Sequence, residues 1–443
     1  MFLFCYNILM IYASKRLKIT GGRQLEGHVR IGYAKNAILP FLAAMLVTKD
    51  TVKIPLTHLI DTKAKLSLLE HMGYKINYTS NEITIIPSIS INKNLPSHLV
   101  ASIRSSILFL GPLLALGREV VLNFPGGDQL ERTFDFHIEC LKKMGALIHL
   151  EDNKIYAKLP EGQSLKAVEY TFPKSSVGAT QHMLLTAILC EKGSITTLNN
   201  CAQEPECLFL VHVLKKYFKA NITKMGSRFI IVGNGDRLGD GDTHHIEFLE
   251  DRIEALTYLA LGLITGGKVT IEGKNLLSIM GGADLELLIK IGGTLTIENN
   301  WMTIENKSGE LKAVKYTESG EFPLCSTDFM PIFCTLLGAA NGTSIFTEKI
   351  HKNRFQYIEE INKFGGVFLL HNSRPNTIII HGSDYVAVSN GICPDIRGGM
   401  ALLMAALRVD GTSIISNISH IFRGYDYLLE KIISLGGKIE IIE

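Results

Sequence analysis

The sequence lacks the cysteine and histidine patterns that mark disulfide frameworks, metal sites and redox centres. Its 443 residues include one tryptophan, eight cysteines and 14 histidines, but no CxxC, no HExxH and no paired metal spacing. No structural metal is therefore expected. Several cysteines lie inside apolar runs, where buried thiols act as small hydrophobic side chains. We expect a reduced, cytoplasmic protein.

Strong charge asymmetry and long apolar runs are also missing. The formal net charge is +2, and no basic patch with interleaved aromatic residues occurs, so nucleic acid is not an expected partner. Apolar runs are interrupted by Gly, Pro or charged residues before they reach membrane-spanning length. The apolar start Met1–Tyr12 is too short to span a bilayer and has no basic region before it, so we interpret it as an over-called start or a loose leader. A monomer that binds small molecules and no membrane is expected.

The common phosphate-loop and nucleophile motifs are missing as well. The chain has no GxGxxG, GxxxxGK[ST], GxSxG or HRD pattern. Gly233–Gly241 is rich in glycine, but no apolar helix follows it, so it is interpreted as a turn-rich connection. Glu204–Pro205–Glu206 offers two carboxylates, but two residues of the same charge that flank a proline in a loop are more often a solvated turn. With 46% apolar and 20% charged residues, the chain is globular and long enough for two or three domains.

A repeat of about 73 residues runs through nearly the whole chain. In each copy an amphipathic helix is followed by a glycine, or its equivalent, and two short strands. The register points of the six copies are 71 to 74 residues apart. They are Gly73, Gly145, Phe218, Gly292, Gly365 and Gly436.

Each repeat holds a second helix that is apolar on most faces. Such a helix is expected in the interior of a domain, and each is followed by a short β-rich run. The pattern predicts an α/β fold with helices inside and sheets outside. The predicted buried helices are Lys35–Val47, Arg104–Ala115, Ser176–Cys190, Asp251–Ile264, Thr327–Ala339 and Asp395–Leu407.

Polar residues gather at the first turn of these buried helices. Ser176, Thr327, Asp251 and Asp395 are explained as ordinary N-caps. The cations at the same positions are not explained in this way, because a positive charge is unfavourable at the positive end of the helix macrodipole. An anionic ligand would account for them, and helix starts related by the repeat would converge on one cleft for phosphates and carboxylates. The cations are Lys35, Arg104, Arg252 and Arg397.

The loop Phe124–Arg132 places an acid and an arginine on a turn that contains Pro125 and two glycines. It follows the predicted strand Glu119–Phe124 and precedes a helix predicted to begin near Thr133. An isolated PGGD sequence is typical of a plain surface turn. Together with the helix-start cations, Asp128 and Arg132 also suit a lid with a proton donor and an anion clamp.

Several motifs in combination resemble the enolpyruvyl transferases, and the resemblance runs from about Leu17 to the C-terminus. They are YAKNAILP at 33–40, RSSI and LGP at 104–112, PGGD…R at 125–132, KSSVGAT at 174–180, EPE at 204–206, DRIE at 251–254, TD at 327–328, NRF at 353–355, DIR at 395–397 and RGY at 423–425.

The resemblance implies an α/β fold of two inside-out α/β barrel domains, with three repeats in each. One domain would comprise residues 1–34 and 245–443. The other would be the inserted segment 35–244, carrying the lid loop 124–132. The implied reaction transfers the enolpyruvyl group of phosphoenolpyruvate to the 3′-hydroxyl of UDP-N-acetylglucosamine and releases phosphate, as the first committed step of peptidoglycan synthesis. No metal or organic cofactor is implied.

The resemblance also implies roles for individual residues. Asp328 would be the base at the sugar hydroxyl, although it also fits a first-turn acid of a helix, and Asp395 would orient a cationic partner. Phosphoenolpyruvate would be bound by Lys35, Asn36, Arg132, Arg397 and Arg423, of which Lys35 and Arg397 would also serve catalysis. The sugar nucleotide would contact Arg104, Arg132, Thr133, Phe134, Asp135, Phe136, Lys174, Ser175, Ser176, Val177, Asp328 and Ile350.

The main departure from the family is in the lid. Relatives usually carry cysteine where this chain has Asp128, and the lid is one residue shorter before Arg132. The ordinary pKa of an aspartate is about 3.9, too low to hold a proton at neutral pH, whereas that of cysteine is about 8.5. We hypothesise that Asp128 is the general acid and is protonated only beside bound phosphoenolpyruvate. Epoxide inhibitors of the fosfomycin type alkylate the family's thiolate, so insensitivity is expected.

Three alternatives stay open. The acceptor could be a shikimate-type acid, because that sister family shares the fold. A non-catalytic relative would explain the altered lid. An enzyme that modifies RNA ends, built on similar repeats, is disfavoured by the near-neutral charge.

Overall fold

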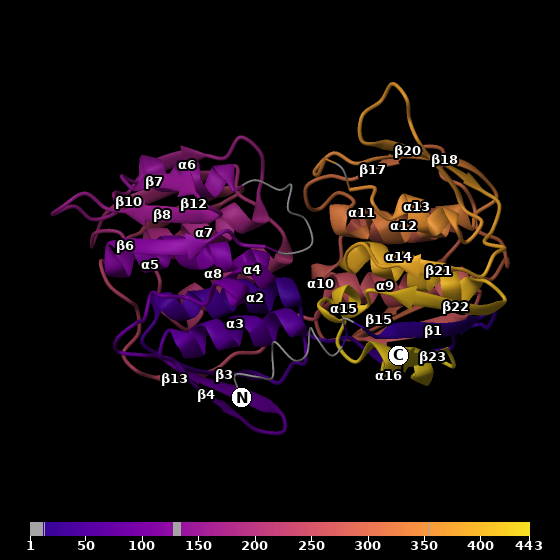
Figure 1. The fold of residues 1–443 in the computed structure, drawn as a ribbon, viewed down its shortest axis with the longest axis horizontal. Helices are drawn as coiled ribbons and strands as arrows, with labels where there is room; N and C mark the ends of the chain where they lie inside the picture. Colours follow the sequence, from indigo (N-terminus) through magenta and orange to yellow (C-terminus); the bar gives the residue numbers. More distant parts are fainter. Residues whose placement is uncertain (1–11, 13, 127–133, 353) are drawn as a thin grey trace. The chain divides into compact units, whose positions relative to one another are not determined.

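The computed structural model describes residues 12, 14–126, 134–352 and 354–443 (Figure 1). The chain divides into two compact units, residues 1–34 with 250–443 (unit 1) and residues 35–249 (unit 2). The predicted return of the chain at residue 245 falls at the end of β13 (Thr243–His245). This strand pairs with β3 (Thr51–Pro55), and the boundary between the units therefore lies after residue 249.

In the described part of the chain, the strands form six sheets, three in each unit. Five sheets have four strands and the same plan, in which one edge pair is parallel and the other pairs are antiparallel. The sixth, β6-β8-β7, has three antiparallel strands. This shared plan is the structural counterpart of the sequence repeat.

In unit 1 the strands Arg16–Gly21, Trp301–Glu305 and Gly411–Ser416 alternate buried residues with more exposed ones, as expected for sheets that cover a helical interior. One sheet contains β21 (Asn390–Ile392), β22 (Gly411–Ser416), β1 (Arg16–Gly21) and β23 (Lys438–Ile442), the second β15 (Thr294–Glu298), β16 (Trp301–Glu305), β14 (Lys268–Glu272) and β2 (Gly27–Arg30), and the third β17 (Thr317–Glu318), β18 (Gly342–Thr347), β20 (Thr377–Gly382) and β19 (Val367–Leu370).

Unit 2 repeats the arrangement. Its sheets are β11 (Ile222–Met225), β12 (Arg228–Val232), β10 (Ile195–Asn199) and β9 (Glu169–Thr171); β13, β3, β5 (Glu82–Ile86) and β4 (Lys75–Tyr78); and β6 (Glu119–Asn123), β8 (Lys154–Lys158) and β7 (Leu147–Glu151). The strand predicted before the lid loop is confirmed as β6.

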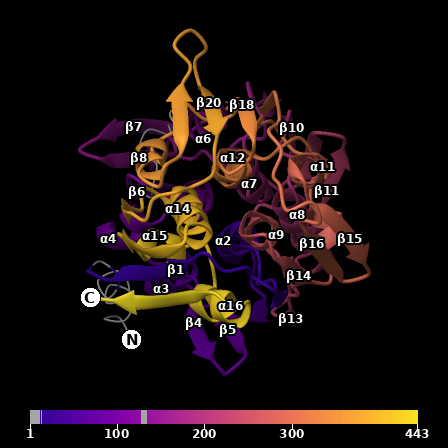
Figure 2. The same ribbon diagram turned by 90° about the vertical axis from the view of Figure 1, so that its right-hand side faces the viewer.

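The six predicted buried helices are confirmed. In unit 1, α9, α12 and α14 pack on one another, and Figure 2 shows them within the surrounding strands. Every residue of α9 is buried, which matches its apolar composition. The buried helices are α2 (Lys35–Ala44), η2 and α5 (Arg104–Phe109 and Leu110–Gly117), α7 (Val177–Ile188), α9 (Arg252–Thr265), η3 and α12 (Thr327–Phe329 and Met330–Gly338) and α14 (Ile396–Arg408).

The amphipathic helices complete the repeats. They are α3 (Ile60–His71), α6 (Asp135–Lys143), α8 (Pro205–Lys216), α11 (Gly282–Ile291), α13 (Ile358–Asn362) and α16 (Leu428–Ser434), with short connecting helices η1 (Met45–Val47), α4 (Ser97–Ser102), α10 (Leu276–Ile279) and α15 (Ser419–Phe422).

The register glycines follow the amphipathic helices. Gly73 and its four glycine counterparts take positive φ, and in the repeat with Phe218 the neighbouring Lys219 does so instead. None of the helices in the described ranges is long and apolar enough to cross a membrane.

Candidate active site

In unit 1, Asp328 is held by two arginines. It lies in η3, where the Nη2 atom of Arg354 is 2.5 Å from its Oδ1 atom and the Nε atom of Arg397 is 4.0 Å away. The Asp328 side chain is 27% exposed, whereas those of Arg354 and Arg397 are 4% and 5% exposed. Two nearly buried guanidinium groups therefore favour the ionised carboxylate at a position that solvent can reach.

A hydrogen-bonded chain fixes Arg354. Its Nη1 atom donates to Oγ1 of Thr327 (2.8 Å), which in turn donates to Oε2 of the buried Glu348 (2.8 Å). The backbone N–H groups of Ile350 and His351 donate to the other oxygen of Glu348, at 2.7 and 2.9 Å. The loop that carries Ile350 is thus tied to the start of η3 through one carboxylate.

Arg397 stands in the first turn of α14, where Asp395 is the N-cap. Asp395 Oδ1 accepts from the backbone N–H groups of Arg397 and Gly398, both at 2.8 Å. The guanidinium of Arg397 lies 5.5 Å from the centre of the Tyr425 ring. Burial lowers the pKa of Arg397, but Tyr425, Asp328 and Asp251 outweigh burial and raise it. The starts of α9, η3 and α14 therefore meet around this cation.

The Nη1 atom of Arg397 is buried and has no hydrogen-bond partner among the described residues. A buried charged donor without an acceptor is costly, so an anion is the natural occupant of the space before it. Arg423, at the end of α15, is 8% exposed and lies two residues before Tyr425. The predicted phosphoenolpyruvate residues of this unit thus lie in neighbouring segments of the chain and at helix ends.

The helix-start cation Arg252 also packs on aromatic rings. It is 4% exposed and lies over the rings of Phe322 and Phe329, at 5.7 and 5.6 Å from their centres. Asp251 caps the same helix by accepting from the N–H groups of Ile253 and Glu254. The start of α9 therefore combines a capping carboxylate with a cation packed on aromatic rings, as the start of α14 does with Asp395, Arg397 and Tyr425.

In unit 2, Lys35 opens α2 and is paired with Asp61. Its Nζ atom lies 3.6 Å from Oδ2 of Asp61, in the first turn of α3, and both residues are nearly buried. The neighbouring Asn36 is partly exposed. Lys65, fully buried on α3, donates from Nζ to the backbone oxygen of Ser105 at 3.0 Å. Lys65 was not among the predicted site residues, and the mixed polar and apolar sequence of α3 does not distinguish it from Lys63.

Arg104 begins η2 and stacks on Phe134. The Cζ atom of its guanidinium is 4.2 Å from the ring centre, and burial lowers its pKa to about 10. Phe134 is the N-cap residue of α6 and also packs against Phe124, the first residue of the predicted lid. Asp135 and Phe136 follow in the first turn of α6. The structure therefore brings Arg104 together with the segment predicted to contact the sugar nucleotide.

The start of α7 carries the KSSV segment. Ser176 is the N-cap and accepts from the N–H of Ala179 at 3.4 Å. Lys174 is exposed, and Ser175 and Val177 are partly exposed. The N–H groups of Val177 and Gly178 in the first turn donate to no acceptor in the described part of the chain. This end of a buried helix can receive an anion.

Three predicted residues, Asp128, Arg132 and Thr133, lie outside the described residues. The role predicted for each stays a prediction. Sequence reasoning missed two residues that the structure brings to the site, Arg354 and Tyr425. Both stand in motifs used for the resemblance, NRF and RGY, so a basic or aromatic residue within those motifs was the available signal.

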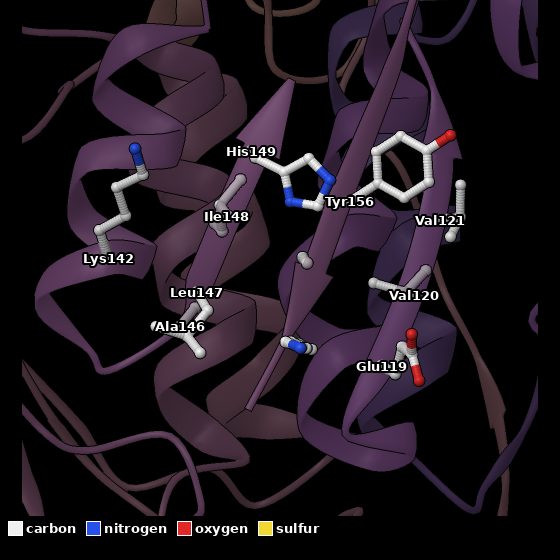
Figure 3. A pocket seen from close by; sticks show the side chains of 11 residues that line it. Glu119, Val120, Val121, Lys142, Ala146, Leu147, Ile148, His149 and Tyr156 are labelled. Carbon is white, nitrogen blue, oxygen red and sulfur yellow. The ribbon is translucent and has the colours of Figure 1, made fainter. Parts of the chain in front are cut away.

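A separate pocket of about 460 Å³ lies on the sheet β6-β8-β7. Figure 3 shows Glu119, His149 and Tyr156 among its lining side chains, with Lys142 contributed by α6. None of the predicted site residues is among those that line it. In the described ranges, no group of three or more His, Cys, Asp or Glu side chains is arranged to hold a metal ion.

Comparisons with known proteins agree over nearly the full chain. A family model for EPSP synthase (3-phosphoshikimate 1-carboxyvinyltransferase) matches residues 19–432. The UDP-N-acetylglucosamine 1-carboxyvinyltransferase of Kosmotoga olearia is 34% identical over 425 residues, covering 96% of this chain and 98% of its own. The enzyme of that name from Idiomarina loihiensis is 35% identical over 430 residues, covering 96% and 99%.

Solved structures share the fold at lower identity. The enolpyruvyl transferase NikO from Streptomyces tendae superposes with a TM-score of 0.85 at 20% identity, covering 96% of this chain and 98% of its own. EPSP synthase from Acinetobacter baumannii superposes with a TM-score of 0.73 at 20% identity, covering 97% of this chain and 100% of its own. The two-domain inside-out α/β fold is thereby established. The chain belongs to the EPSP synthase family of enolpyruvyl transferases.

Proposed function

We propose that the protein transfers the enolpyruvyl group of phosphoenolpyruvate to the 3′-hydroxyl of UDP-N-acetylglucosamine and releases phosphate. This is the first committed step of peptidoglycan synthesis. The relatives that are 34–35% identical over nearly their full length carry the name of this activity.

The observation that carries the proposal is the cluster around Asp328. An ionised carboxylate that solvent reaches stands beside a buried guanidinium, Arg397, with an unused donor atom. A base next to an anion-binding cation is what this reaction needs, because an alcohol is deprotonated beside a phosphate and a carboxylate. The fork of an arginine suits either anion better than the point charge of lysine.

The reaction proceeds by addition and elimination. Asp328 accepts the proton of the sugar 3′-hydroxyl as the oxygen attacks the central carbon of phosphoenolpyruvate, while an acid protonates the methylene carbon. The methyl group of the resulting intermediate then loses a proton, and the bond to phosphate oxygen breaks with its electron pair. Phosphate leaves, and the enolpyruvyl ether remains on the sugar.

The proposed binding roles are those that the resemblance to the family implies, and the positive charges of the residues support them. Phosphoenolpyruvate is bound by Lys35, Asn36, Arg132, Arg397 and Arg423, and its anionic groups compensate the cations at the helix starts. The sugar nucleotide is contacted by Arg104, Arg132, the 133–136 segment, the 174–177 segment, Asp328 and Ile350. No metal or organic cofactor enters the proposal.

Asp128 is proposed as the general acid. It stands where relatives usually carry cysteine, and its ordinary pKa of about 3.9 requires a partner that raises it. The charges of bound phosphoenolpyruvate supply that shift, because neighbouring anions disfavour a second negative charge. We further propose that the protein acts in the cytoplasm as a monomer and is insensitive to epoxide inhibitors of the fosfomycin type.

One observation favours a second acceptor. The matching family model describes a 3-phosphoshikimate transferase, and EPSP synthase structures share the fold. Transfer to a shikimate-type acceptor, such as shikimate 3-phosphate, is therefore the first alternative function. The second alternative is a non-catalytic relative that keeps the fold.

Phosphate release from phosphoenolpyruvate separates these functions. The protein is incubated with phosphoenolpyruvate alone, with UDP-N-acetylglucosamine, and with shikimate 3-phosphate. Release that depends on the sugar nucleotide supports the proposal, and release that depends on shikimate 3-phosphate supports the alternative. Asp328→Asn is the matched control, because it keeps the shape of the side chain but removes the base.

A further inference from the structure

Two histidines form a buried pair behind the start of α7. His137 lies on α6 and is 7% exposed, and His182 lies on α7 and is fully buried. Their Nδ1 atoms are 3.0 Å apart. The backbone N–H of Gly111 donates to the Nε2 atom of His182 at 2.8 Å. The pair thus connects α5, α6 and α7.

These contacts determine which nitrogen of each ring carries the proton. An N–H from Gly111 requires a bare Nε2 on His182, so neutral His182 carries its proton on Nδ1. That proton is donated to His137, whose Nδ1 must then be bare. His137 therefore carries its proton on Nε2.

Both rings are neutral in the folded protein. Burial, followed by the charge of Arg104, lowers the pKa of His137 to about 3. Burial, followed by His137 and Lys65, lowers that of His182 further below its ordinary value. A proton on both nitrogens of His137 would also point one N–H at the Nδ1–H of His182. The tautomers are thus held by geometry and by the surrounding charges.

The Nε2–H of His137 faces the first turn of α7. A Cβ atom added at Gly178 would lie 3.5 Å from both Nε2 and Cε1 of His137. The only hydrogen bond that His137 makes to the described residues uses its other nitrogen, Nδ1. Val177 and Gly178 likewise have N–H groups without an acceptor in the part of the chain that the structure describes. Three donors therefore surround one position, and one of them belongs to a side chain that is more than nine-tenths buried.

We infer that His137 is a binding residue whose Nε2–H, fixed by His182, donates to a phosphate of the sugar nucleotide at the start of α7. This inference rests on the proposed function, since that function supplies the nucleoside diphosphate. A neutral donor suits the position because Arg104, whose charge already acts on His137, provides the positive charge nearby. His182 acts through His137 and is a positioning residue.

Glycine at two positions permits this arrangement. A Cβ at Gly111 would lie 2.0 Å from Oγ1 of Thr186 and 2.9 Å from Nε2 of His182, so a larger residue would displace the N–H that fixes the tautomer. At Gly178 a Cβ would meet His137 at an ordinary contact distance but would cover its Nε2 edge. Gly178→Ala is therefore tolerated by the fold and blocks the donor.

The test is calorimetric binding of UDP-N-acetylglucosamine and of UDP to four proteins. His137→Asn keeps a polar atom near the Nδ1 position but loses the donor at Nε2, and His137→Gln keeps a donor near Nε2. Relative to wild type, we expect roughly tenfold weaker binding for His137→Asn and Gly178→Ala and a change within about threefold for His137→Gln. Equal binding by wild type, His137→Asn and Gly178→Ala would overturn the inference.

A second readout separates this inference from the proposed function. Nitrogen NMR of histidine-labelled wild type reports which ring nitrogen is protonated, without any ligand. A proton on Nε2 of His137 and on Nδ1 of His182 is expected, and the opposite pair of tautomers contradicts the inference. If wild type binds neither UDP-N-acetylglucosamine nor UDP, the proposed function and the nucleotide ligand fail together, whatever the tautomers. If wild type binds and the two blocking variants bind equally well, only the inference fails.

Discussion

Arg354 and Asp328 form the shortest link in the candidate active site, with Nη2 and Oδ1 2.5 Å apart. The arginine is almost fully buried, while the carboxylate is reached by solvent. Since Nη1 of the same arginine donates to Thr327, the guanidinium also fixes the start of η3. The direction in which Asp328 points is therefore set by Arg354, a residue that was not among the predicted site residues.

Replacing Arg354 is expected to lower turnover more than substrate affinity. Arg354→Lys keeps the charge but cannot contact Thr327 and Asp328 with one planar group, so Asp328 loses its fixed direction. We expect kcat to fall by roughly tenfold or more, with a smaller change in KM for phosphoenolpyruvate. Steady-state kinetics measure both constants. An unchanged kcat would remove Arg354 from the positioning of the base.

Asp328→Asn is expected to lower kcat by roughly 100-fold or more, because the amide cannot accept the hydroxyl proton. Folding is expected to survive, since the substitution keeps the size of the side chain. Thermal unfolding provides the control for structure. A variant with wild-type turnover would show that another group is the base.

Asp128 determines the expected response to an epoxide inhibitor. A carboxylate is a poor nucleophile toward an epoxide, so wild type is predicted to keep its activity after incubation with fosfomycin. Asp128→Cys introduces a thiol and is predicted to become sensitive. Mass spectrometry of the intact protein detects the covalent adduct. Stoichiometric labelling of wild type would contradict this prediction.

Asp128→Asn tests the acid role of the same residue. The amide cannot deliver a proton, so kcat is expected to fall by roughly 100-fold or more. The pH dependence of kcat for wild type is the accompanying measurement. A variant with the same profile and height as wild type would exclude Asp128 as the general acid.

The histidine pair predicts a loss of stability in acid. Burial lowers the pKa values of His137 and His182, whereas the unfolded chain protonates both rings below about pH 6.5. The pair is therefore neutral in both states above pH 6.5, and stability is lost as pH falls from there toward 3. Between pH 7 and 5 the loss is on the order of 2 kcal/mol for each histidine.

Urea unfolding of wild type at pH 7 and pH 5 measures this loss. The double variant His137→Asn with His182→Gln has no titrating ring at either position, and its glutamine can still accept from Gly111. It is expected to lose less stability than wild type over the same interval. Equal losses in the two proteins would assign the acid sensitivity to other groups.

Lys65 is expected to reduce stability at neutral pH. Burial lowers its pKa well below the ordinary value, although Asp61 opposes the shift. Since the unfolded chain holds this proton more tightly, stability falls as pH drops below about 10.4. Lys65→Met is expected to raise the melting temperature, because Asp61 keeps Lys35 as a partner. Lys63→Met on the same helix, where the side chain is partly exposed, is the matched control and is expected to change little.

The fold could be predicted from the sequence because its signals are local and repeated. Six apolar helices and six register points at a constant spacing indicated sheets around helices, and the structure has this arrangement in each unit. The predicted N-caps Ser176, Asp251 and Asp395 are confirmed, whereas the prediction for Thr327 is wrong because Ser326 caps η3 and accepts from the N–H of Asp328. Short-range hydrogen bonds of this kind depend on residues that are close together in the sequence.

The contacts within the site could not be predicted in the same way. Arg354 and Asp328 form a hydrogen bond although they are 26 residues apart in the sequence. His137 and His182 do so across 45 residues. Neither spacing matches a helix or strand period, so only the tertiary fold brings these side chains together. The helix-start cations illustrate the same limit, since the sequence does not predict that Arg252 packs on Phe322 and Phe329 or that Arg397 packs on Tyr425.

The most direct test of the central claim is the proton NMR spectrum of the product formed from phosphoenolpyruvate and UDP-N-acetylglucosamine. The proposed function predicts vinyl signals of an enolpyruvyl ether on the sugar, with the 3′ position shifted and phosphate released in equal amount. Asp328→Asn should form little of this product in the same time. An unmodified sugar nucleotide under conditions in which shikimate 3-phosphate is converted would contradict the account.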